Sequence, residues 1–307
     1  MKYDKKLLFL VNPNAGKANI KNHLAYITDL FVRNGYLVTL YTTQPEDDLA
    51  EITVELLGRE DYDLLVCSGG DGTLNHVING LLHLDSPPRL GYIPAGTTND
   101  FAVSFALPKN PSRAADVIMN GVPTPFDAGK FMDDRYFAYV AAFGAFIDVS
   151  FDTPQDAKNT WGKAAYLMEG VKRLPSLHPH HIRLEYDGGV IEDEILLGII
   201  SNSPYVAGMP VGKINAACMN DGIMEVVLLK DPHNALELGP VISKFLAGEL
   251  DKNRIYSLKS RKVHITSPDE ILWTLDGECG GAFSEVKIEN VPNALEIIAM
   301  PEGTRKK

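Results

Sequence analysis

A glycine-rich turn at residues 68–75 has the residue types and the spacing of a phosphate-binding site. It reads Ser68-Gly69-Gly70-Asp71-Gly72-Thr73-Leu74-Asn75, between an apolar stretch and a helical pattern. Three glycines in four positions allow close backbone approach, and the first N–H groups of a helix can bind an anion. Asp71 repels a phosphate unless a cation or a hydroxyl proton lies between them. The turn therefore suggests phosphoryl transfer rather than passive binding.

The common nucleotide motifs do not fit this chain. The dinucleotide fingerprint G-x-G-x-x-G has Asn75 where its last glycine belongs. A Walker A loop fails because Gly16-Lys17 is followed by Ala18, with Val11 in place of the first glycine. An ordinary strand-to-helix turn, in which glycine serves geometry alone, therefore stays open as the alternative.

Two other polar turns follow apolar stretches and favour a binding site. Residues 12–17 read Asn-Pro-Asn-Ala-Gly-Lys, and residues 93–100 read Ile-Pro-Ala-Gly-Thr-Thr-Asn-Asp. In a parallel sheet such turns, at the carboxyl ends of the strands, gather at one edge, where ligands bind. Three of them predict a nucleotide crevice.

A pair of carboxylates near the end of the chain suggests a general base. Asp276-Gly277-Glu278 follows the apolar residues 272–275. A carboxylate that takes the proton from an alcohol contributes typically ~10² to 10⁴-fold to phosphoryl transfer. In an extended segment the two acids share a face, so either could be the base. The alternative is an ordinary Asp-Gly turn.

Histidines at positions 178, 180 and 181 surround Pro179 without the spacing of a zinc site. We therefore expect a solvated loop there. Two groups of basic residues predict either solvated faces or a local membrane-docking surface. They are Lys158, Lys163, Lys172 and Arg173, and Lys252, Arg254, Lys259, Arg261 and Lys262.

The elements that must position these residues divide the chain in two. Residues 1–126 alternate apolar strands at 7–11, 37–41, 63–67 and 90–93 with helical patterns at 20–34, 47–58, 73–82 and 111–120. This order predicts an α/β domain with a parallel, helix-covered sheet.

Residues 127–292 have hairpin-like patterns, with Asp187-Gly188-Gly189 as a strong turn signal between strands at 181–186 and 191–201. Further strands are expected at 224–229, 263–266, 272–275 and 286–288, and helices at 159–174 and 234–247. We predict a mostly antiparallel β-sandwich, with residues 293–307 as a candidate segment to return to the first domain.

Composition limits the partners. The 307 residues include 40 acids and 29 bases, a net charge of −11, which disfavours broad adsorption to nucleic acid or anionic lipid. The longest mostly apolar stretch, residues 136–147, is shorter than the ~20 residues of a membrane span. Three cysteines without CxxC spacing fit a reducing cytoplasm. We expect a cytoplasmic protein that binds no nucleic acid and touches membranes only locally and transiently.

Over essentially its whole length, the sequence resembles the bacterial diacylglycerol kinase and lipid kinase family, which is related to sphingosine kinases and NAD kinases. Four motifs in the right order support the resemblance. They are Asn12-Pro13-x-x-Gly16-Lys17, the 69–75 turn, Pro94-x-Gly96-Thr97-x-Asn99-Asp100-Phe101 and Asp276-Gly277-Glu278.

The resemblance implies roles for individual residues. The positions implied to contact ATP are Asn12, Pro13, Asn14, Ala15, Gly16, Thr43, Gly69, Gly70, Asp71, Gly72, Thr73, Leu74, Asn75 and Thr97. Thr42, next to Thr43, is the alternative residue for that position. Asp71, Asp100 and Asp127 are implied to belong to a catalytic Mg²⁺ and water network. A helix cap for Asp100 and the end of a linker for Asp127 are the alternatives.

The resemblance also implies two roles in the second domain. Glu278 is the implied proton acceptor, with Asp276 bound into the metal network. Asp221, with the backbone carbonyls of Cys218 and Ile223, is implied to hold a structural Mg²⁺, for which such oxygens are suitable ligands. An ordinary Asp-Gly turn at residues 221–222 is the alternative.

The predicted function is transfer of the γ-phosphoryl group of MgATP to a lipid hydroxyl, most plausibly that of diacylglycerol. One rival is a soluble NAD kinase-type enzyme, which shares the GGDGT sequence; the Asn-Pro turn and the DGE sequence disfavour it. The other is a regulator that binds nucleotide or lipid without catalysis, and the carboxylates present here disfavour that. The family also implies a candidate homodimer.

Overall fold

The computed structural model describes residues 4–16, 19–97, 99–144, 178–203, 205–206, 209–210, 219–231, 251 and 253–301. The chain divides into two compact units, one of Met1–Ala128 with Asn293–Lys307 and the other of Gly129–Pro292. Along the sequence, the second unit is thus inserted into the first. The sequence-derived boundary lay two residues earlier, at 126. The helices expected at 159–174 and 234–247 lie outside the described residues.

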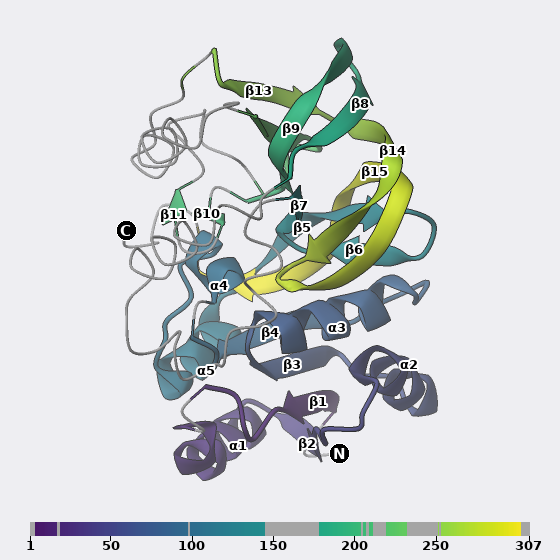
Figure 1. The fold of residues 1–307 in the computed structure, drawn as a ribbon. Coiled ribbons are helices and arrows are strands. Elements are labelled where there is room, and N and C mark those ends of the chain that lie inside the picture. Colours follow the sequence, from purple (N-terminus) through teal and green to yellow (C-terminus); the bar gives the residue numbers. More distant parts are fainter. Residues whose placement is uncertain are drawn as a thin grey trace. The chain divides into compact units, whose positions relative to one another are not determined.

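The first unit contains a sheet of parallel strands in the order β2-β1-β3-β4-β15 (Figure 1). The strands are β1 (Lys5–Val11), β2 (Tyr36–Thr42), β3 (Leu64–Gly69), β4 (Arg89–Pro94) and the end of β15 (Glu278–Ala299). Five consecutive residues of β1 and all six of β3 are buried. Such continuous apolar runs are typical of strands covered on both faces.

Helices cover this sheet in two pairs, α1 with α5 and α2 with α3. Their bounds are α1 (Leu24–Arg33), α2 (Leu49–Arg59), α3 (Asp71–Leu82), α4 (Asp100–Ser104) and α5 (Pro111–Asn120). The helix expected at 20–34 is divided into a 3₁₀ turn, η1 (Asn19–Asn22), and α1, and α4 was not predicted. Helix α2 begins where Asp48 accepts the N–H groups of Ala50 and Glu51, a standard N-cap.

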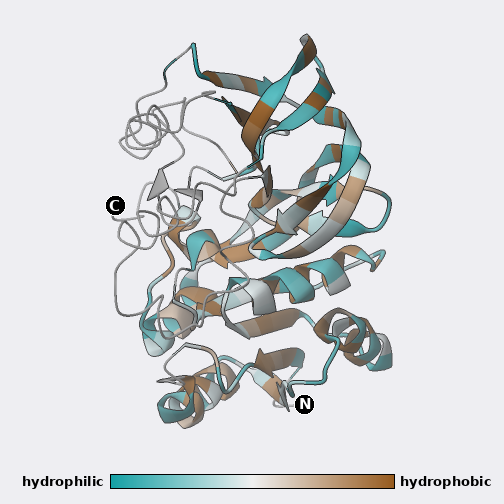
Figure 2. Ribbon diagram, viewed as in Figure 1, coloured by the Kyte–Doolittle hydropathy of each residue, from teal (hydrophilic) through white to brown (hydrophobic). Residues whose placement is uncertain are grey.

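One hydrophobic cluster of the first unit lies between the sheet and helices α1 and α5. Alternate residues of β1, among them Leu7 and Phe9, pack against Ile27 and Phe31 of α1. The rings of Phe9 and Phe31 meet edge to face at 5.6 Å. Figure 2 shows hydrophobic residues concentrated on the strands of this sheet.

Mainly antiparallel strands form the second unit. They are paired in the order β13-β12-β9-β7-β14-β15, and β8 joins both β9 and β14. Their bounds are β5 (Val122–Phe131, which crosses the boundary), β6 (Arg135–Phe137), β7 (Val140–Gly144), β8 (His180–Tyr186), β9 (Gly189–Ser201), β12 (Met224–Lys230), β13 (Ile255–Ser260) and β14 (Lys262–Leu275); β10 (Tyr205–Val206) and β11 (Met209–Pro210) form a separate ribbon.

The centre of this unit is Trp273, which is fully buried against Phe131 and Phe143. Separate strands were expected at 263–266 and 272–275. The structure has one strand, β14, because an irregularity between Thr266 and Ile271 shifts the register without ending the strand.

Candidate active site

In the first unit, the turns that follow β1, β3 and β4 are joined by hydrogen bonds. The backbone N–H of Asn12 donates to Ser68 O at 2.8 Å, and the Asn12 side chain donates to Thr73 Oγ1 at 3.1 Å. The N–H of Ala95 donates to Gly69 O at 2.8 Å. The three turns therefore form one continuous edge.

Two glycines allow these turns to approach one another. Gly16 has φ 54°, and a Cβ there would clash with the carbonyl oxygen of Ala95. A Cβ on Gly96 would lie 2.7 Å from the Cα of Gly70. Both positions therefore require the absence of a side chain, and the edge is built mainly of backbone.

Tyr92 and Asn99 hold this edge in place, although the sequence analysis gave neither a role. The buried Tyr92 hydroxyl donates to Gly69 O at 3.0 Å. Burial raises the pKa of Tyr92, so this hydroxyl keeps its proton at neutral pH. The Asn99 side chain accepts from Gly96 N at 2.9 Å and donates to Gly96 O at 2.7 Å. The left-handed backbone of Asn99, with φ 55°, is tolerated best by glycine and asparagine, which was the available signal in the sequence.

Asp71 and Asp100 come together at the starts of α3 and α4. The backbone N–H of Asp100 donates to Asp71 Oδ2 at 3.2 Å. Asp71 is half-buried and Asp100 is only 2% exposed. This backbone contact brings Asp100 next to the Asp71 carboxylate. Carboxylate oxygens are ligands that a hard divalent cation prefers, so the two residues fit the metal that the family resemblance implies. Within the described ranges, no group of three or more His, Cys, Asp and Glu side chains could hold a metal ion by itself.

The other predicted nucleotide-binding residues lie on or near the same edge. Asn14 N–H donates to Asn12 Oδ1 at 3.0 Å, which closes the turn that also contains Pro13 and Ala15. Thr43 N–H donates to Val11 O at 2.9 Å, so this residue lies beside the end of β1. Thr97 is exposed in the turn after β4. The remaining residues, Gly72, Leu74 and Asn75, lie in the first turns of α3, where the side chains of Leu74 and Asn75 are buried.

Asp127 has a structural contact where the chain leaves the first unit and returns to it. The side chain is fully buried, and its Oδ1 accepts the N–H of Asn293 at 2.7 Å. This bond ties β5 to the returning end of β15 within the first unit. A metal-network role for Asp127 stays a prediction.

In the second unit, Asp276 and Gly277 form the tight turn between β14 and β15. Leu275 pairs with Glu278, and the two turn residues have φ 51° and 91°. Positive φ at both positions is characteristic of a type I′ hairpin turn. Asp276 and Gly277 thus form an Asp-Gly turn, which was the alternative interpretation of the DGE sequence. Glu278 follows this turn directly, as the exposed first residue of β15.

The carboxylate of Asp276 is engaged by the backbone. It accepts the N–H groups of Ala138 at 2.6 Å, Tyr139 at 3.0 Å and Val140 at 2.9 Å. The side chain is 3% exposed. A carboxylate that already accepts three donors is a poor proton acceptor, because protonation would disrupt those bonds. The Glu278 side chain is exposed and has no hydrogen bond or ion pair with any residue that the structure describes, so it is the better candidate for the base.

The predicted structural metal site is only partly described. Asp221 is exposed, and its Oδ1 accepts the N–H of Ile223 at 3.1 Å across Gly222, which has φ 73°. Cys218 lies outside the described residues. The bond to Ile223 fits an ordinary Asp-Gly turn equally well, so the metal stays a prediction.

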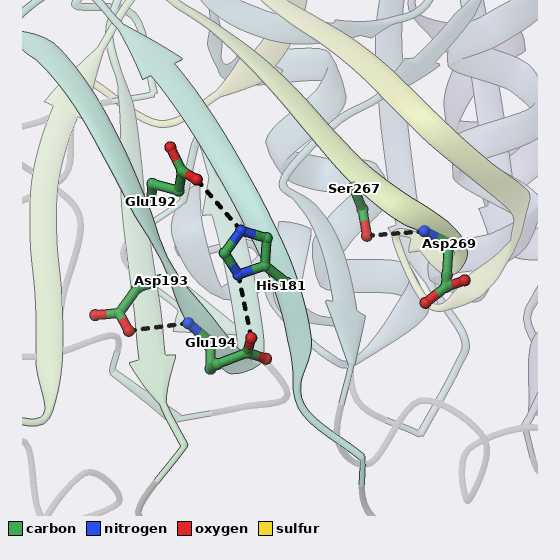
Figure 3. A network of polar contacts seen from close by, with 6 residues as sticks. All are labelled: His181, Glu192, Asp193, Glu194, Ser267 and Asp269. Atoms are coloured by element: carbon green, nitrogen blue, oxygen red, sulfur yellow. Dashed lines mark hydrogen bonds and ion pairs between the residues drawn. The ribbon is translucent and has the colours of Figure 1, made fainter.

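The histidine cluster differs from the expected loop. His180 and His181 begin β8, where they pair with Ile195 and Glu194 of β9. The His181 ring lies between Glu194 at 3.1 Å and Glu192 at 3.3 Å, both on β9 (Figure 3). The strand predicted from residue 181 is therefore confirmed and begins one residue earlier, so the loop expected around Pro179 does not include residues 180 and 181. The His181 ring has carboxylate partners on the neighbouring strand.

Models of two known protein domains match this chain. Residues 6–131 match the diacylglycerol kinase catalytic domain, and residues 146–299 match the YegS C-terminal NAD kinase beta sandwich-like domain. The match supports the expected two-domain architecture with a sandwich-like second domain.

Individual proteins show the same similarity. A diacylglycerol kinase of Bacillus subtilis (strain 168) is 35% identical over 279 residues, 90% of this chain and 91% of the relative. A diacylglycerol kinase of Staphylococcus aureus (strain MRSA252) is 34% identical over 278 residues, 90% of this chain and 87% of the relative.

Solved structures agree. A crystal structure of a candidate diacylglycerol kinase from Bacillus anthracis str. Sterne has a TM-score of 0.82 at 27% identity, and the match covers 98% of this chain and 97% of that one. A second structure from that strain, at 23% identity and TM-score 0.74 with 98% of each chain covered, shows the shared fold. Among the described residues, no helix has the length and apolar character needed to span a bilayer.

Proposed function

Since the chain belongs to the diacylglycerol kinase family and is a lipid kinase of that type, we propose that it transfers the γ-phosphoryl group of MgATP to the free hydroxyl of diacylglycerol. The products are phosphatidic acid and ADP. The observation that carries this proposal is the backbone edge of the first unit, where three turns meet and Asp71 lies beside Asp100. Backbone N–H groups with a nearby carboxylate pair suit a triphosphate and its cation.

The residues of the chain have separate tasks in this reaction. The turns at residues 12–16, 69–75 and 96–97 bind and orient the nucleotide, and Asp71 and Asp100 hold the cation. When bound, Mg²⁺ neutralises the charge that develops on the phosphoryl oxygens. Glu278 accepts the proton from the lipid hydroxyl. A bond forms between the lipid oxygen and the γ-phosphorus as the bond from that phosphorus to the β–γ bridging oxygen breaks, and ADP leaves.

Radiolabelled ATP tests the proposal when it is incubated with diacylglycerol in mixed micelles, with NAD, or with neither. We expect labelled phosphatidic acid only in the first reaction. Label in NADP would instead identify a nucleotide kinase, and no transfer in any reaction would indicate a binding protein without catalysis.

Asp71→Ala is expected to abolish the transfer, because it removes half of the carboxylate pair. The matched control is Glu51→Ala. Glu51 is likewise an acidic residue in the first turn of a helix, α2, but its neighbour Ala50 packs against Gly80, near the other end of α3. Equal activity of the two variants would contradict the role of Asp71.

We also propose that basic residues of the second unit make transient contact with the membrane that holds the lipid. Arg261 and Lys262 are exposed, whereas Lys259 lies 3.0 Å from the carboxylate of Glu225. Neutralising Arg261 and Lys262 to Gln should weaken sedimentation with vesicles that contain phosphatidylglycerol, and unchanged binding would discard this surface. The first basic group and Lys252 lie outside the described residues. A homodimer stays a family-based proposal, which sedimentation velocity tests.

A further inference from the structure

A β-bulge follows directly after Glu278 in the second unit. On β15, Cys279 pairs with Thr274 of β14, but the next pair joins Gly281 to Trp273. Gly280 is therefore an extra residue in β15. Bulges bend a strand locally and often lie next to active sites, where they redirect a side chain. The direction of Glu278 thus depends on how firmly this bulge is held.

The guanidinium of Arg135 binds both carbonyl groups of the bulge. Its Nη1 donates to Gly280 O at 2.6 Å, and its Nη2 donates to Cys279 O at 3.0 Å. Arg135 lies on β6, more than 140 positions earlier in the sequence. The planar fork of an arginine fixes two acceptors at once, and a lysine cannot reproduce this with a single ammonium group.

The opposite side of the same turn is held from the segment that follows Arg135. Asp276 accepts the N–H groups of residues 138, 139 and 140, and the Tyr139 hydroxyl donates to Asp276 O at 3.1 Å. Glu278 is thus bounded by a fixed residue two positions before it and by a fixed bulge immediately after it. Both supports come from residues 135–140.

We propose that Arg135 is a positioning residue for Glu278: by holding the bulge at residues 279–280, it fixes the direction of the carboxylate that takes the proton. The inference rests on the proposed function of Glu278 as base. Loss of this support should slow the reaction strongly, because a displacement of about 1 Å in a reacting group can lower a rate by ~10²-fold. Among the described residues, the Arg135 side chain hydrogen-bonds only to the backbone of the bulge.

The test compares Arg135→Met, which removes the donors, with Arg135→Lys, which restores one. Arg183→Met is the control, since Arg183 is also a strand arginine of this unit but, in the described part of the chain, its side chain binds only the partly exposed Glu185. For Arg135→Met we expect kcat with diacylglycerol to fall by ~10 to 10²-fold, with little change in the KM for ATP. Arg135→Lys should recover part of kcat, and the control should match the wild type.

Hydrogen exchange supplies a measurement without substrate. In Arg135→Met, amides of residues 278–282 should exchange faster, while those of the β8–β9 hairpin should not change. Unchanged exchange at the bulge, or a kcat within twofold of the wild type, would overturn the proposal. If Arg135→Met does not fold, Arg135→Lys decides by the same two measurements. An inactive wild type would refute the proposed acceptor instead, and the exchange experiment would still show whether Arg135 holds the bulge.

Discussion

The nucleotide edge of the first unit and the hairpin turn of the second are both fixed loops, but they are fixed by opposite means. At the edge, Gly16 and Gly96 lack side chains, so the backbones of neighbouring turns come into contact. At the hairpin, charged side chains hold the backbone: Asp276 accepts the N–H groups of residues 138–140, and Arg135 donates to the carbonyl groups of residues 279 and 280.

The difference reflects what each loop has to present. In the proposed function, the edge presents backbone N–H groups to an anionic ligand, and side chains would obstruct them. The hairpin exposes the carboxylate of Glu278, and other side chains can therefore bind its backbone without blocking that carboxylate. Substitutions that add atoms should therefore disrupt the structure of the edge, whereas substitutions that remove side-chain atoms should disrupt the hairpin.

The largest expected effect comes from removing the carboxylate that the hairpin presents. Glu278→Gln should lower kcat for diacylglycerol by ~10² to 10⁴-fold, because an amide cannot accept the proton. The melting temperature should stay the same, since the exposed Glu278 has no partner in the described part of the chain. Glu289→Gln, also exposed on β15, is the control and should keep full activity. An active Glu278→Gln enzyme would mean that Glu278 is not the base of the reaction.

Removing the carboxylate of Asp276 should damage the fold instead. Asp276→Ala leaves three buried N–H groups without their acceptor and should lower the free energy of unfolding by about 3 kcal/mol. Asp187→Ala is the matched control, because Asp187 also lies in an Asp-Gly hairpin turn of this unit, but its carboxylate accepts, among the described residues, only the N–H of Arg261, at 2.7 Å. Urea unfolding measures both. A smaller loss for Asp276→Ala than for the control would contradict the structural role of Asp276.

Adding one methyl group at the edge should have the smallest of the three effects. Gly96→Ala places a Cβ 2.7 Å from Gly70 Cα and should separate the two turns, raising the KM for ATP by about tenfold, or ~1.4 kcal/mol. Gly58→Ala in α2 is the control, because no atom lies within 4 Å of its added Cβ. That variant should be slightly more stable, by ~0.5 kcal/mol, with unchanged KM. Equal KM values for the two variants would show that the edge does not depend on its glycines.

The edge could be predicted from the sequence to a large extent. Its turns directly follow apolar strands, and the parallel pairing of β1, β3 and β4 brings the ends of such strands together. Helix α5 was placed at its observed bounds, 111–120, since Asn110 and Pro111 are strong start signals. Tyr92 was missed because an aromatic residue in a buried strand resembles any core residue.

The support of the hairpin could not be predicted. Arg135 and residues 279–280 are distant in sequence, and the bulge exists only once β14 and β15 are in register. Asp276 could be recognised as a turn residue, but its three acceptor bonds depend on residues 138–140, which have no distinctive pattern. Long-range side-chain-to-backbone bonds leave no periodic signal in one sequence.

The returning end of β15 has a consequence for the order in which the protein is made. Leu295, Ile297 and Ile298 are buried in the first unit, and Ile297 pairs with Leu90 of β4. These residues are synthesised only after the whole second unit. While the chain is still growing, β4 therefore lacks the partner strand it has in the finished protein, and an unpaired edge invites wrong pairing. The first unit is therefore the first to be synthesised, but it is completed only when the end of β15 has been made.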